Sequence, residues 1–505
     1  MNNEHLQNVI SFVSQKGFIW GPEPEIYNGL SGFYTYGPLG KLLKNKVEDT
    51  IRKDFVRSEF FEVECPIVLP KKVWEASGHL GGFSDPMVEC TKCESRFRID
   101  ELIGEKVPEL KDKVKAEDYQ KVIKKHKIMC PSCNELFKEE ITQHSLMLKT
   151  TIGMGTEAYC RPETATASYL PFPRYADFFR HKLPFGVFQI GKAFRNEISP
   201  RQYLIRLREF TQAEGQLFMN PDEKKSFYKF DLISDNKLPL VPEKNQGKEF
   251  KIDEISLKQA LSKKYIKSKA YGWTLNLAYD LYVNLGIPKE RIRIRQHRKD
   301  EMAFYADDAW DIEVNLNSFG WQEMCGVHDR TDYDLVQHEK FSGKKLEVND
   351  NGIKIKPHVL EIAFGTDRPV FALLDIFYEK KEEGQGKSIL SLPLEICPIQ
   401  AAVLPLFRKD NMPETAKLIA ENLREEFSIK YDETQSIGKR YLRAAEEAIP
   451  FCVTVDYDTL KDKTVTLRDR DSEKQVRVKI DDLNETLKSL FSKTKTFDEL
   501  EAKTI

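Results

Sequence analysis

The sequence predicts an α+β fold in which helices and antiparallel strands form the first part of the chain and a separate α/β domain forms the last. Residues 194–210 are typical of an antiparallel hairpin, while 310–324 and 358–374 indicate a strand and a strand followed by a helix. From about residue 391, strands and helices alternate in βαβ-like units. We therefore expect two domains, at 1–390 and 391–505.

The first domain begins with a long helix that leads into a strand. Pro66 and Pro70 stop the strand that we predict within FFEVECPIVLP, residues 60–70. The helix is predicted over residues 39–57 because seven apolar side chains recur there at helical spacing. They are Leu39, Leu42, Leu43, Val47, Ile51, Phe55 and Val56.

Two polar segments interrupt the apolar pattern of the first domain. A charged stretch at about 86–145, bracketed by two cysteine pairs, is typical of an inserted module. A lysine-rich stretch at about 221–265 indicates a second insertion or a surface excursion. We expect the remaining segments to form the main sheet and its helices.

Composition excludes a membrane protein and favours a reducing compartment. The chain is 40% hydrophobic and 31% charged, and no apolar run approaches the roughly 20 residues of a membrane helix. The N-terminus lacks the basic and apolar regions of a secretion signal, so we expect a cytoplasmic protein. Because the net charge is only −2, a nucleic-acid partner must be held by local basic patches.

The segment FRNEISPRQYLIRLREF, residues 194–210, concentrates arginines beside aromatic rings. In a strand, side chains two residues apart share a face, so Arg195 and Glu197 are expected to project together. The same rule places Arg206, Arg208 and Phe210 on one face, while the apolar residues between them point into the core. Those apolar residues are Ile205 and Leu207.

This face offers the groups that a nucleotide needs. Guanidinium binds phosphate oxygens in a bidentate manner, an aromatic ring stacks on a base, and a carboxylate accepts from an exocyclic amine. The alternative is a solvated hairpin held by cross-strand ion pairs. The segment by itself does not decide between these interpretations.

Four cysteines have the spacing of a structural zinc site. Cys90 and Cys93 form one CxxC pair, and Cys130 and Cys133 form the second after a gap of 36 residues. Two tight turns that each supply two thiolates suit tetrahedral zinc. We expect the metal to fold the inserted module, with no open ligand position for catalysis.

Three motifs resemble those of the class II aminoacyl-tRNA synthetases. FRNE, a loop and RxxxF look like motif 2, and the helix and strand that end in ECP look like motif 1. FGTDRPVFALL is similar to motif 3, with Arg368 at the start of a helix. The resemblance implies an antiparallel-sheet catalytic domain, a zinc-ribbon-like insertion and a C-terminal anticodon-binding domain. It also implies a homodimer that forms through the Pro66 region.

Further stretches resemble the dimeric glycyl-tRNA synthetases of the archaeal and eukaryotic style. They include GFYTYGPLG, WEASGHLGGFSDPMVEC, RPETA, REFTQAEGQLF, HDRTDYDL and, near the C-terminus, IGKRYLRAAEEAIPFCVTVD. This family attaches glycine to tRNA(Gly) in two steps, through an adenylate formed from ATP with Mg²⁺. Such chemistry depends on positioning and charge stabilisation, which agrees with the lack of a catalytic triad.

The resemblance implies an ATP site whose catalytic residues are Arg195 and Arg368. Arg195 is expected to hold the α-phosphate and the attacking carboxylate, and Arg368 the γ-phosphate. Glu197 is expected to bind the adenine amino group, Arg206 or Arg208 the outer phosphates, and Phe210 the adenine ring. The full expected set is Arg195, Asn196, Glu197, Ile205, Arg206, Leu207, Arg208, Glu209, Phe210, Glu323, Met324, Gly365, Thr366, Asp367 and Arg368.

The resemblance also implies a small acidic pocket for glycine. A pocket cannot gain affinity from an absent side chain, so it must grip the ammonium group, and Glu163, Glu214 and Glu361 match the acidic residues of the family. Binding the ammonium relieves the repulsion between buried carboxylates. The full expected set is Arg98, Glu163, Phe210, Thr211, Gln212, Ala213, Glu214, Glu361, Ala363 and Gly365.

The sequence departs from the family pattern beside this pocket. Ala363 stands where the family usually has serine, and RPETA is followed by TAS instead of QGI. Gly215 and Gln216 replace a usual isoleucine and glutamate. A ligase for alanine or serine therefore remains open as an alternative. A non-catalytic relative that binds nucleic acid is a further alternative, but it would be expected to lose the ATP arginines.

Two basic stretches are candidates for contact with tRNA phosphates. ERIRIRQHRKDEM, residues 290–302, alternates arginine with isoleucine, and its alternative is a solvated strand face. Lys439, Arg440 and Arg443 share a helix face in the second domain. For these three residues the resemblance favours contact with RNA.

Overall fold

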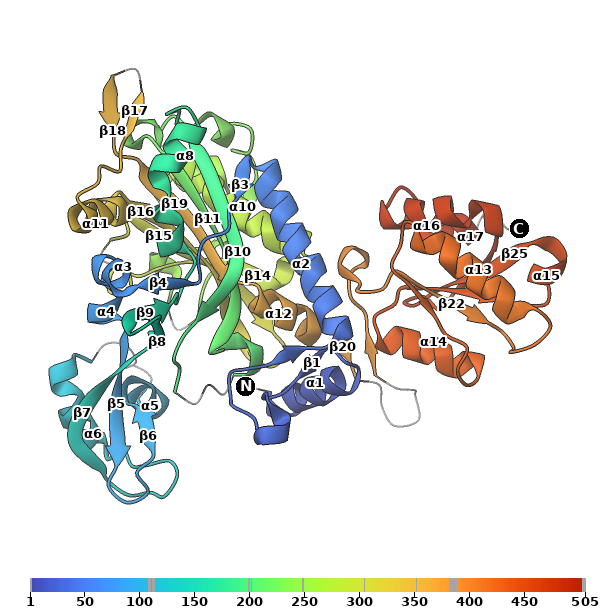
Figure 1. The fold of residues 1–505 in the computed structure, drawn as a ribbon, viewed down its shortest axis with the longest axis horizontal. Coiled ribbons are helices and arrows are strands. Elements are labelled where there is room, and N and C mark those ends of the chain that lie inside the picture. The colour runs from blue at the N-terminus through green and yellow to red at the C-terminus, as the bar shows by residue number, and fades with distance from the viewer. Residues whose placement is uncertain are drawn as a thin grey trace.

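A nine-stranded sheet forms the centre of the larger part of the molecule (Figure 1). The computed structural model describes residues 2–107, 110, 114–198, 200, 202–247, 249–303, 305–350, 352–380 and 388–501. Within them, the strand order is β13-β12-β14-β15-β16-β19-β11-β10-β3. Neighbours are antiparallel, except that β3 runs parallel to β10 and β12 runs parallel to β14. The strands are β3 (Phe60–Glu62), β10 (Phe185–Phe194), β11 (Glu209–Met219), β12 (Lys237–Val241), β13 (Asp253–Ser256), β14 (Ile292–Gln296), β15 (Asp308–Leu316), β16 (Gly320–Thr331) and β19 (His358–Gly365).

Helices α2 (Pro38–Arg57), α10 (Lys269–Asn284) and α12 (Asp367–Phe377) pack on this sheet. Helix α2 confirms the helix predicted over 39–57, and Pro38 occupies its first turn, where a proline N–H is not needed. Its side chains at helical spacing, from Leu39 to Phe55, are buried in the main core, whereas Leu42 and Val56 remain exposed. The predicted strand and helix at 358–374 correspond to β19 and α12.

Three parts of the main sheet differ from the sequence expectation. The strand predicted within 60–70 is two strands, β3 and β4 (Val68–Pro70), because Pro66 interrupts it and β4 pairs elsewhere. The stretch 221–265 supplies the edge strand β13 and its neighbour β12, and the apolar residues Leu238, Leu240 and Val241 of β12 are buried in the core. The strand predicted at 310–324 is the antiparallel pair β15 and β16, joined by a turn at residues 317–319.

The predicted insertion folds as a module with its own sheet and core (Figure 1, lower left). Its strand order is β6-β5-β7, and its helices pack beside the strands. These elements are β5 (Ser84–Cys90), β6 (Arg96–Arg98), α5 (Ile99–Lys106), α6 (Tyr119–His126) and β7 (Phe137–Ser145). A further three-stranded sheet, ordered β4-β9-β8, joins the module to the rest. Its added strands are β8 (Leu148–Ile152) and β9 (Thr156–Cys160).

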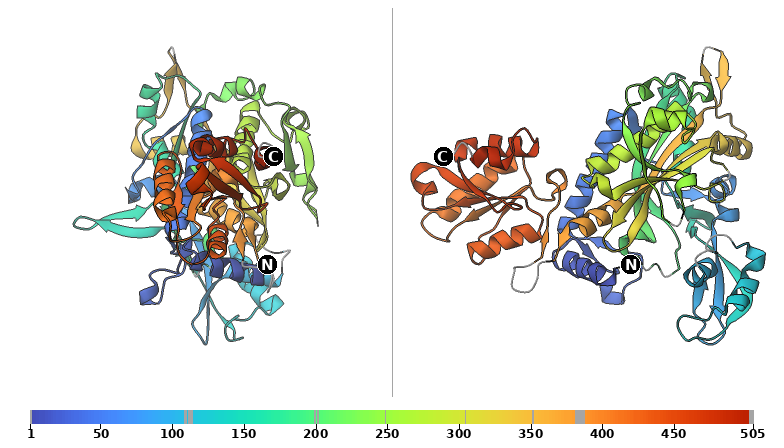
Figure 2. Two further views of the ribbon diagram at one scale, coloured as in Figure 1. Left: turned by 90° about the vertical axis from the view of Figure 1, so that its right-hand side faces the viewer. Right: turned by 180° about the vertical axis from the view of Figure 1, so that it is seen from behind.

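The C-terminal part contains a second, five-stranded sheet with its own apolar clusters on both faces (Figure 2). The order is β23-β22-β24-β25-β26, and β22 runs parallel to both of its neighbours, as expected for βαβ units. Helices α13 and α14 confirm the two helices predicted near 413–427 and 437–448. The elements are β22 (Ala401–Pro405), α13 (Met412–Arg424), β23 (Ile429–Tyr431), α14 (Ile437–Glu446), β24 (Phe451–Val455), α15 (Thr459–Asp462), β25 (Thr464–Asp469), β26 (Gln475–Lys479), α16 (Leu483–Phe491) and α17 (Phe497–Glu501).

None of the helices in the described ranges is long and apolar enough to cross a membrane.

Short elements complete the chain between these units. The remaining helices are α1 (Asn3–Gln15), α3 (Lys71–Ala76), α4 (His79–Gly82), α7 (Ala165–Tyr169), α8 (Phe172–Phe178), α9 (Leu257–Ser262) and α11 (Tyr333–Ser342). The remaining strands are β1 (Ile19–Trp20), β2 (Thr35–Tyr36), β17 (Val348–Asp350), β18 (Ile353–Ile355), β20 (Tyr378–Glu379) and β21 (Ile389–Leu390).

Candidate active site

A cavity of about 240 Å³ opens against the middle strands β11, β16 and β19 of the main sheet. It brings together most of the residues predicted to bind ATP and glycine, although Glu163 and Arg368, for example, are 205 residues apart in the chain. The predicted residues that line it are Glu163, Arg195, Glu197, Ile205, Arg206, Leu207, Phe210, Gln212, Glu214, Glu323, Met324, Glu361, Ala363, Gly365, Asp367 and Arg368.

The arginine-rich segment is an antiparallel hairpin, as predicted, but four of its charged residues lie outside the paired strands: Arg195, Glu197, Arg206 and Arg208. Phe194 ends β10 and pairs with Glu209, which begins β11. Arg195 and Glu197 therefore follow β10, while Arg206 precedes β11 after a 3₁₀ turn at Tyr203–Ile205. Ile205 and Leu207 are buried, as expected. Within the loop, Ser199 and Arg201 lie outside the described residues.

Arg195 lies between two aromatic rings at one end of the cavity. Its guanidinium carbon is 5.5 Å from the centre of the Phe210 ring and 5.4 Å from that of Phe83. Its Nε donates to the carbonyl of Pro162 at 3.2 Å, which fixes the direction of the side chain. Burial lowers the pKa of Arg195, against the opposing effect of Glu163, but the group stays charged at neutral pH. The cavity thus holds a fixed cation beside an aromatic face.

Two further arginines extend the positive charge along the cavity. Arg206 donates from Nε to Glu197 Oε2 at 2.8 Å and from Nη1 to Glu101 Oε1 at 2.6 Å. Arg368, at the start of α12, donates from Nη1 to the Glu323 carbonyl at 2.7 Å. The pairing of Arg206 with Glu197 is the intramolecular ion pair that the solvated-hairpin alternative requires. It lies inside the cavity, however, because Glu197 is buried.

Three glutamates form the acidic end of the cavity. Glu214 lies on β11 and accepts from Thr164 Oγ1 at 2.6 Å and from Gln212 Nε2 at 2.5 Å. Glu361 lies on the adjacent strand β19 and accepts from Gln216 Nε2 at 3.2 Å. Glu163, in the loop before α7, accepts from Thr166 Oγ1 at 2.7 Å. The group offers several acceptors to a small cation.

The three carboxyl groups differ in the direction of their pKa shifts. Burial, together with Glu361 and Glu163, raises the pKa of Glu214 well above its usual value. Burial also acts to raise the pKa of Glu163, but His79 holds it below the usual value. For Glu361, burial is again outweighed, here by Arg330 and His328, and its pKa is lowered. The raised pKa shifts Glu214 toward its neutral form, which reduces the repulsion within the group.

Residues that sequence reasoning missed complete this end of the cavity. Arg330 Nη1 contacts Glu361 Oε1 at 3.2 Å, and its Nε donates to Asp334 Oδ2 at 2.7 Å. His328 Nδ1 is 3.2 Å from Glu361 Oε1. Both residues lie on β16 within HDRTDYDL, a stretch that resembles the family. The sequence does not show that their side chains contact Glu361, which lies on another strand. Tyr305 also lines the cavity.

Several predicted residues lie away from this cavity. Arg208 donates to the carbonyls of Glu197 and Ser31, and Arg98 pairs with Asp85 and Asp100 in the inserted module. The other predicted residues outside the lining make backbone contacts, pair elsewhere or are buried in the core. They are Asn196, Glu209, Thr211, Ala213 and Thr366.

The carboxylate of Asp367 is held by an internal network of hydrogen bonds. Its carboxylate accepts from Tyr36 OH at 2.5 Å, Lys44 Nζ at 2.6 Å and the Thr211 N–H at 2.7 Å. Burial acts to raise the pKa of Asp367, but Lys44 and these hydrogen bonds hold it below its usual value. Because Asp367 precedes Arg368, the network ties the start of α12 to α2 and β11.

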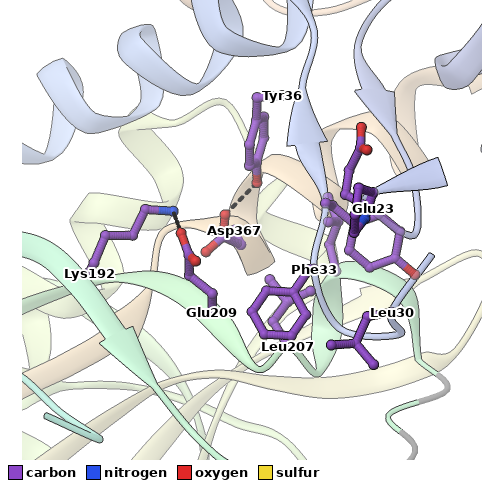
Figure 3. A pocket seen from close by; sticks show the side chains of 11 residues that line it. Glu23, Leu30, Phe33, Tyr36, Lys192, Leu207, Glu209 and Asp367 are labelled. Atoms are coloured by element: carbon purple, nitrogen blue, oxygen red, sulfur yellow. Dashed lines mark hydrogen bonds and ion pairs between the residues drawn. The ribbon is translucent and has the colours of Figure 1, made fainter. Parts of the chain in front are cut away.

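A second cavity, of about 390 Å³, lies behind this network (Figure 3). Tyr36 and Asp367 lie at its wall, and Phe33, Leu30 and Leu207 supply an apolar side. The predicted ATP residue Glu209 faces this second cavity, where it pairs with Lys192 at 3.0 Å. Asp367 borders both cavities.

Comparisons with known proteins identify the family of this chain. Residues 400–490 match a family model described as an anticodon binding domain. The glycine–tRNA ligase of Pyrococcus furiosus is 40% identical over 96% of this chain and 98% of its own. That of Methanocaldococcus jannaschii is 39% identical over 97% of this chain and 99% of its own. The chain belongs to the glycine–tRNA ligase family. It is therefore an ATP-dependent aminoacyl-tRNA ligase, as the motifs predicted.

Solved structures share the fold of this ligase. A Giardia lamblia prolyl-tRNA synthetase in complex with prolyl-adenylate superposes with a TM-score of 0.60 at 14% identity, covering 95% of this chain and 75% of that chain. A Cryptosporidium parvum prolyl-tRNA synthetase complexed with halofuginone and AMPPNP gives 0.58 at 14% identity, with 96% and 75% covered. The predicted class II fold with a C-terminal anticodon-binding domain is confirmed.

The four cysteines of the ligase converge at one end of the inserted module. Their sulfur atoms all lie within 4.8 Å of one another, with Cys90 to Cys133 at 3.4 Å and Cys93 to Cys130 at 3.6 Å. Zinc–sulfur bonds of about 2.3 Å place the thiolates of a tetrahedron about 3.8 Å apart. The residues present therefore fit a zinc ion, with all four positions filled by protein.

The basic stretches predicted for RNA contact are largely engaged within the ligase itself. Arg293 and Arg295 on β14 pair with Glu313, and Arg295 also pairs with Asp311. In the C-terminal part, Arg440 is buried and donates to backbone carbonyls, so it serves the fold and not a phosphate. Arg443 pairs with Asp432 at 3.2 Å, whereas Lys439 is exposed.

Proposed function

We propose that the cavity binds ATP and glycine side by side and forms glycyl-adenylate. The observation that supports this most directly is that Arg195, Phe210 and Arg368 share one cavity with three glutamates, two of which, Glu214 and Glu361, are buried. In this proposal the adenine ring stacks on Phe210, and Arg195 holds the α-phosphate. Arg368 binds the γ-phosphate from the opposite wall, where its guanidinium is anchored to the backbone of Glu323.

The reaction needs no side-chain nucleophile in this arrangement. A carboxylate oxygen of glycine attacks the α-phosphorus, and pyrophosphate leaves. In this proposal Arg195 contacts both the attacking carboxylate and the α-phosphate, so it would neutralise the charge that builds up between them. Glu197 would accept from the adenine amino group, with Arg206 turned from Glu197 toward the outer phosphates.

Magnesium would lie on the phosphate side of the cavity. Glu323 is the predicted carboxylate ligand there, and its side chain is more than half exposed toward the opening. Mg²⁺ takes few protein carboxylates and completes its shell with phosphate oxygens and water. When bound, the ion would offset the charge of the pyrophosphate that leaves.

Glycine would occupy the acidic end of the cavity. Its ammonium group is proposed to lie among Glu163, Glu214 and Glu361, whose charge is already balanced in part by Arg330. An added cation lowers the energy of three close carboxyl groups, so it favours ionisation of Glu214. Selection against larger amino acids would depend on the close packing of this end and not on attraction to a side chain.

Amino-acid-dependent pyrophosphate exchange tests this proposal. We expect exchange with glycine, and much slower exchange with alanine or serine at the same concentration. Ala363 lines the cavity where a hydroxyl is usual in the family, so alanine and serine are the informative competitors. Exchange with alanine or serine alone would overturn the glycine assignment, and no exchange with any of the three would overturn activation at this site.

The C-terminal domain is proposed to hold the anticodon stem of tRNA(Gly). The match to an anticodon binding domain over residues 400–490 supports this. With Arg440 buried, Lys439 is the exposed cation of the predicted helix face. Lys439→Glu is expected to raise the KM for tRNA and leave pyrophosphate exchange unchanged, and an unaltered KM would remove Lys439 from the interface.

A homodimer is proposed to form through the Pro66 region. Pro66 is exposed between Phe61, Ile67 and Val68, which are apolar and also exposed. Exposed apolar side chains in one short segment are typical of a protein interface. Sedimentation of the full chain is expected to give a dimer, and Val68→Asp to give a monomer. A monomeric wild-type protein would contradict the proposal.

Zinc in the module and a cytoplasmic location are proposed together. The nine cysteines are all free, and four of them form the cluster that fits zinc. Free thiols and a tetrathiolate site both suit a reducing compartment. Metal analysis of the purified ligase is expected to give about one zinc per chain at the cysteine site, and a value below about half would count against it.

A further inference from the structure

Three side chains that commonly bind metals meet at the wall of the active-site cavity, away from the cysteine cluster. His297 directly follows β14, Asp311 lies on β15, and His328 lies on β16. One ligand atom of each lies within 4.8 Å of the ligand atoms of the other two. His328 also lines the cavity, so this group is open to solutes that enter there.

The backbone makes room for the imidazole of His328. Gly326 is paired with Asp311 across the two strands, and it lies on the same face of β16 as His328. A Cβ atom on Gly326 would lie 2.5 Å from Cε1 and 3.2 Å from Nε2 of the His328 ring. The ring therefore reaches back over Gly326 toward Asp311, while Nδ1 stays 3.2 Å from Glu361 Oε1.

This orientation suits a metal ligand. A metal-bound histidine usually donates its second ring N–H to a carboxylate, which fixes the tautomer and the ring plane. Glu361 is in position to accept that bond from Nδ1 of His328, which leaves Nε2 for a metal ion.

The other two residues are also held in place. His297 Nε2 is 2.8 Å from Asp311 Oδ1, and its Nδ1 is buried without a partner among the described residues. The second oxygen of Asp311 accepts from Arg295 Nη2 at 2.8 Å, which fixes the carboxylate. The planes of the two imidazoles are inclined at 81°, with ring centres 5.8 Å apart. A proton now bridges His297 and Asp311 where a metal ion would bind.

We propose that His297, Asp311 and His328 form a second metal site, suited to Zn²⁺ or a similar divalent transition metal. Two imidazoles and one carboxylate are zinc ligands, and three protein ligands leave a fourth position for water. Zinc–ligand bonds of about 2.0–2.2 Å require ligand atoms about 3.3 Å apart, so one imidazole moves inward by roughly 1–2 Å. Both imidazoles are partly exposed, which allows that movement.

The site has a consequence for the amino-acid pocket, and this part rests on the function proposed above. A divalent cation held by His328 adds positive charge next to Glu361, which is proposed to bind the glycine ammonium group. Like charges weaken each other's binding at this range. The metal is therefore an inhibitor that competes with glycine and leaves ATP binding unaffected.

Cobalt uptake tests the site itself. The full-length ligase, with its cysteine site filled by zinc, is titrated with Co²⁺ and its visible absorption is recorded. One added Co²⁺ per chain is expected, with the weak bands of nitrogen and oxygen ligands and without thiolate charge transfer. His297→Asn and His328→Ala are expected to abolish uptake, while His181→Gln, at an exposed histidine outside the cavity, retains it.

The outcomes separate clearly. No uptake by the wild-type protein, thiolate charge-transfer bands, or unchanged uptake in both folded histidine variants would overturn the site. In glycine-dependent pyrophosphate exchange, a saturating amount of the metal is expected to raise the KM for glycine several-fold in the wild type and not in His328→Ala. An unchanged KM for glycine refutes the link to the pocket. If glycine supports no exchange at all, the proposed function fails, and the cobalt uptake still decides the site.

Discussion

Replacing Lys44 with methionine isolates the buried ion pair that supports the start of α12. Lys44 Nζ donates to Asp367 Oδ1 at 2.6 Å and to Thr211 Oγ1 at 2.9 Å, and the side chains of the pair are 4% and 3% exposed. Methionine fills a similar volume but leaves the carboxylate with only neutral donors. Removing one partner of a buried pair costs about 3–5 kcal/mol. Because Tyr36 and the Thr211 N–H still donate to Asp367, we expect the free energy of unfolding to fall by about 3 kcal/mol, at the lower end of this range.

The pH dependence of this loss identifies its cause. In the wild type, the lowered pKa of Asp367 contributes stability that is present above the unfolded pKa and is lost as pH falls through the folded value. In the variant, the effect of burial is no longer opposed by Lys44, so the pKa of Asp367 rises. Protonation of Asp367 then removes the free-energy cost of a buried, unpaired carboxylate. The difference in the free energy of unfolding should therefore shrink as pH falls from about 7 to about 5.

Urea unfolding at several pH values measures this difference. Lys44→Met combined with Asp367→Asn is the matched control, since it removes both charges and is expected to recover a large part of the stability. The KM for ATP should rise in Lys44→Met because Asp367 precedes Arg368 in the chain. A stability difference that is constant with pH, or a double variant no more stable than Lys44→Met, would refute the reasoning.

Three more substitutions address separate parts of the molecule. Phe210→Leu removes a ring that is proposed to stack on adenine, so the KM for ATP in pyrophosphate exchange should rise roughly 10- to 100-fold; a change under about twofold would argue against stacking. Burial raises the pKa of Asp308 to about 7, so the folded state holds this proton more tightly than the unfolded chain does. The free energy of unfolding should fall as pH rises from about 4 to about 7, and Asp308→Asn should flatten that slope in urea titrations; the same slope in both proteins would contradict this. Cys130→Ser should lower zinc content and make the 84–145 module sensitive to limited proteolysis, and retention of full zinc would show that the cysteine cluster is not the site.

Local patterns were enough to predict much of the fold. The apolar spacing of 39–57 fixed α2, because one stripe of that helix faces the core. The alternation predicted for the arginine-rich segment was only partly right, since Arg195 lies after the last paired residue of β10 and not within a strand. It still reaches Phe210, because the strands end together. The alternation of side chains predicts that the two strands pair, but it does not predict the residue at which their pairing ends.

Contacts between distant segments were beyond sequence reasoning. In the sequence, Lys44 occupies a polar position of a predicted amphipathic helix, where an exposed side chain is expected. Its partner Asp367 is 323 residues further along the chain, so the buried ion pair cannot be predicted from local pattern. Arg330 and His328 occur in a recognised motif, but their common partner Glu361 lies on another strand. The stretch 221–265 is predicted to be an insertion or a surface excursion because its many lysines interrupt the apolar pattern. The strands β12 and β13 within it are short, so composition alone does not distinguish them from loops.

The contact between Gly326 and the ring of His328 limits how the amino-acid pocket can change by mutation. Any side chain at position 326 would collide with that imidazole, and the collision is with a rigid ring. A shorter residue at position 328 must therefore come first, and only then can position 326 accept a larger one. The reverse order passes through a poorly folded protein. Libraries that aim to reshape this pocket should vary the two positions together, because screens of single substitutions will score every replacement of Gly326 as a loss.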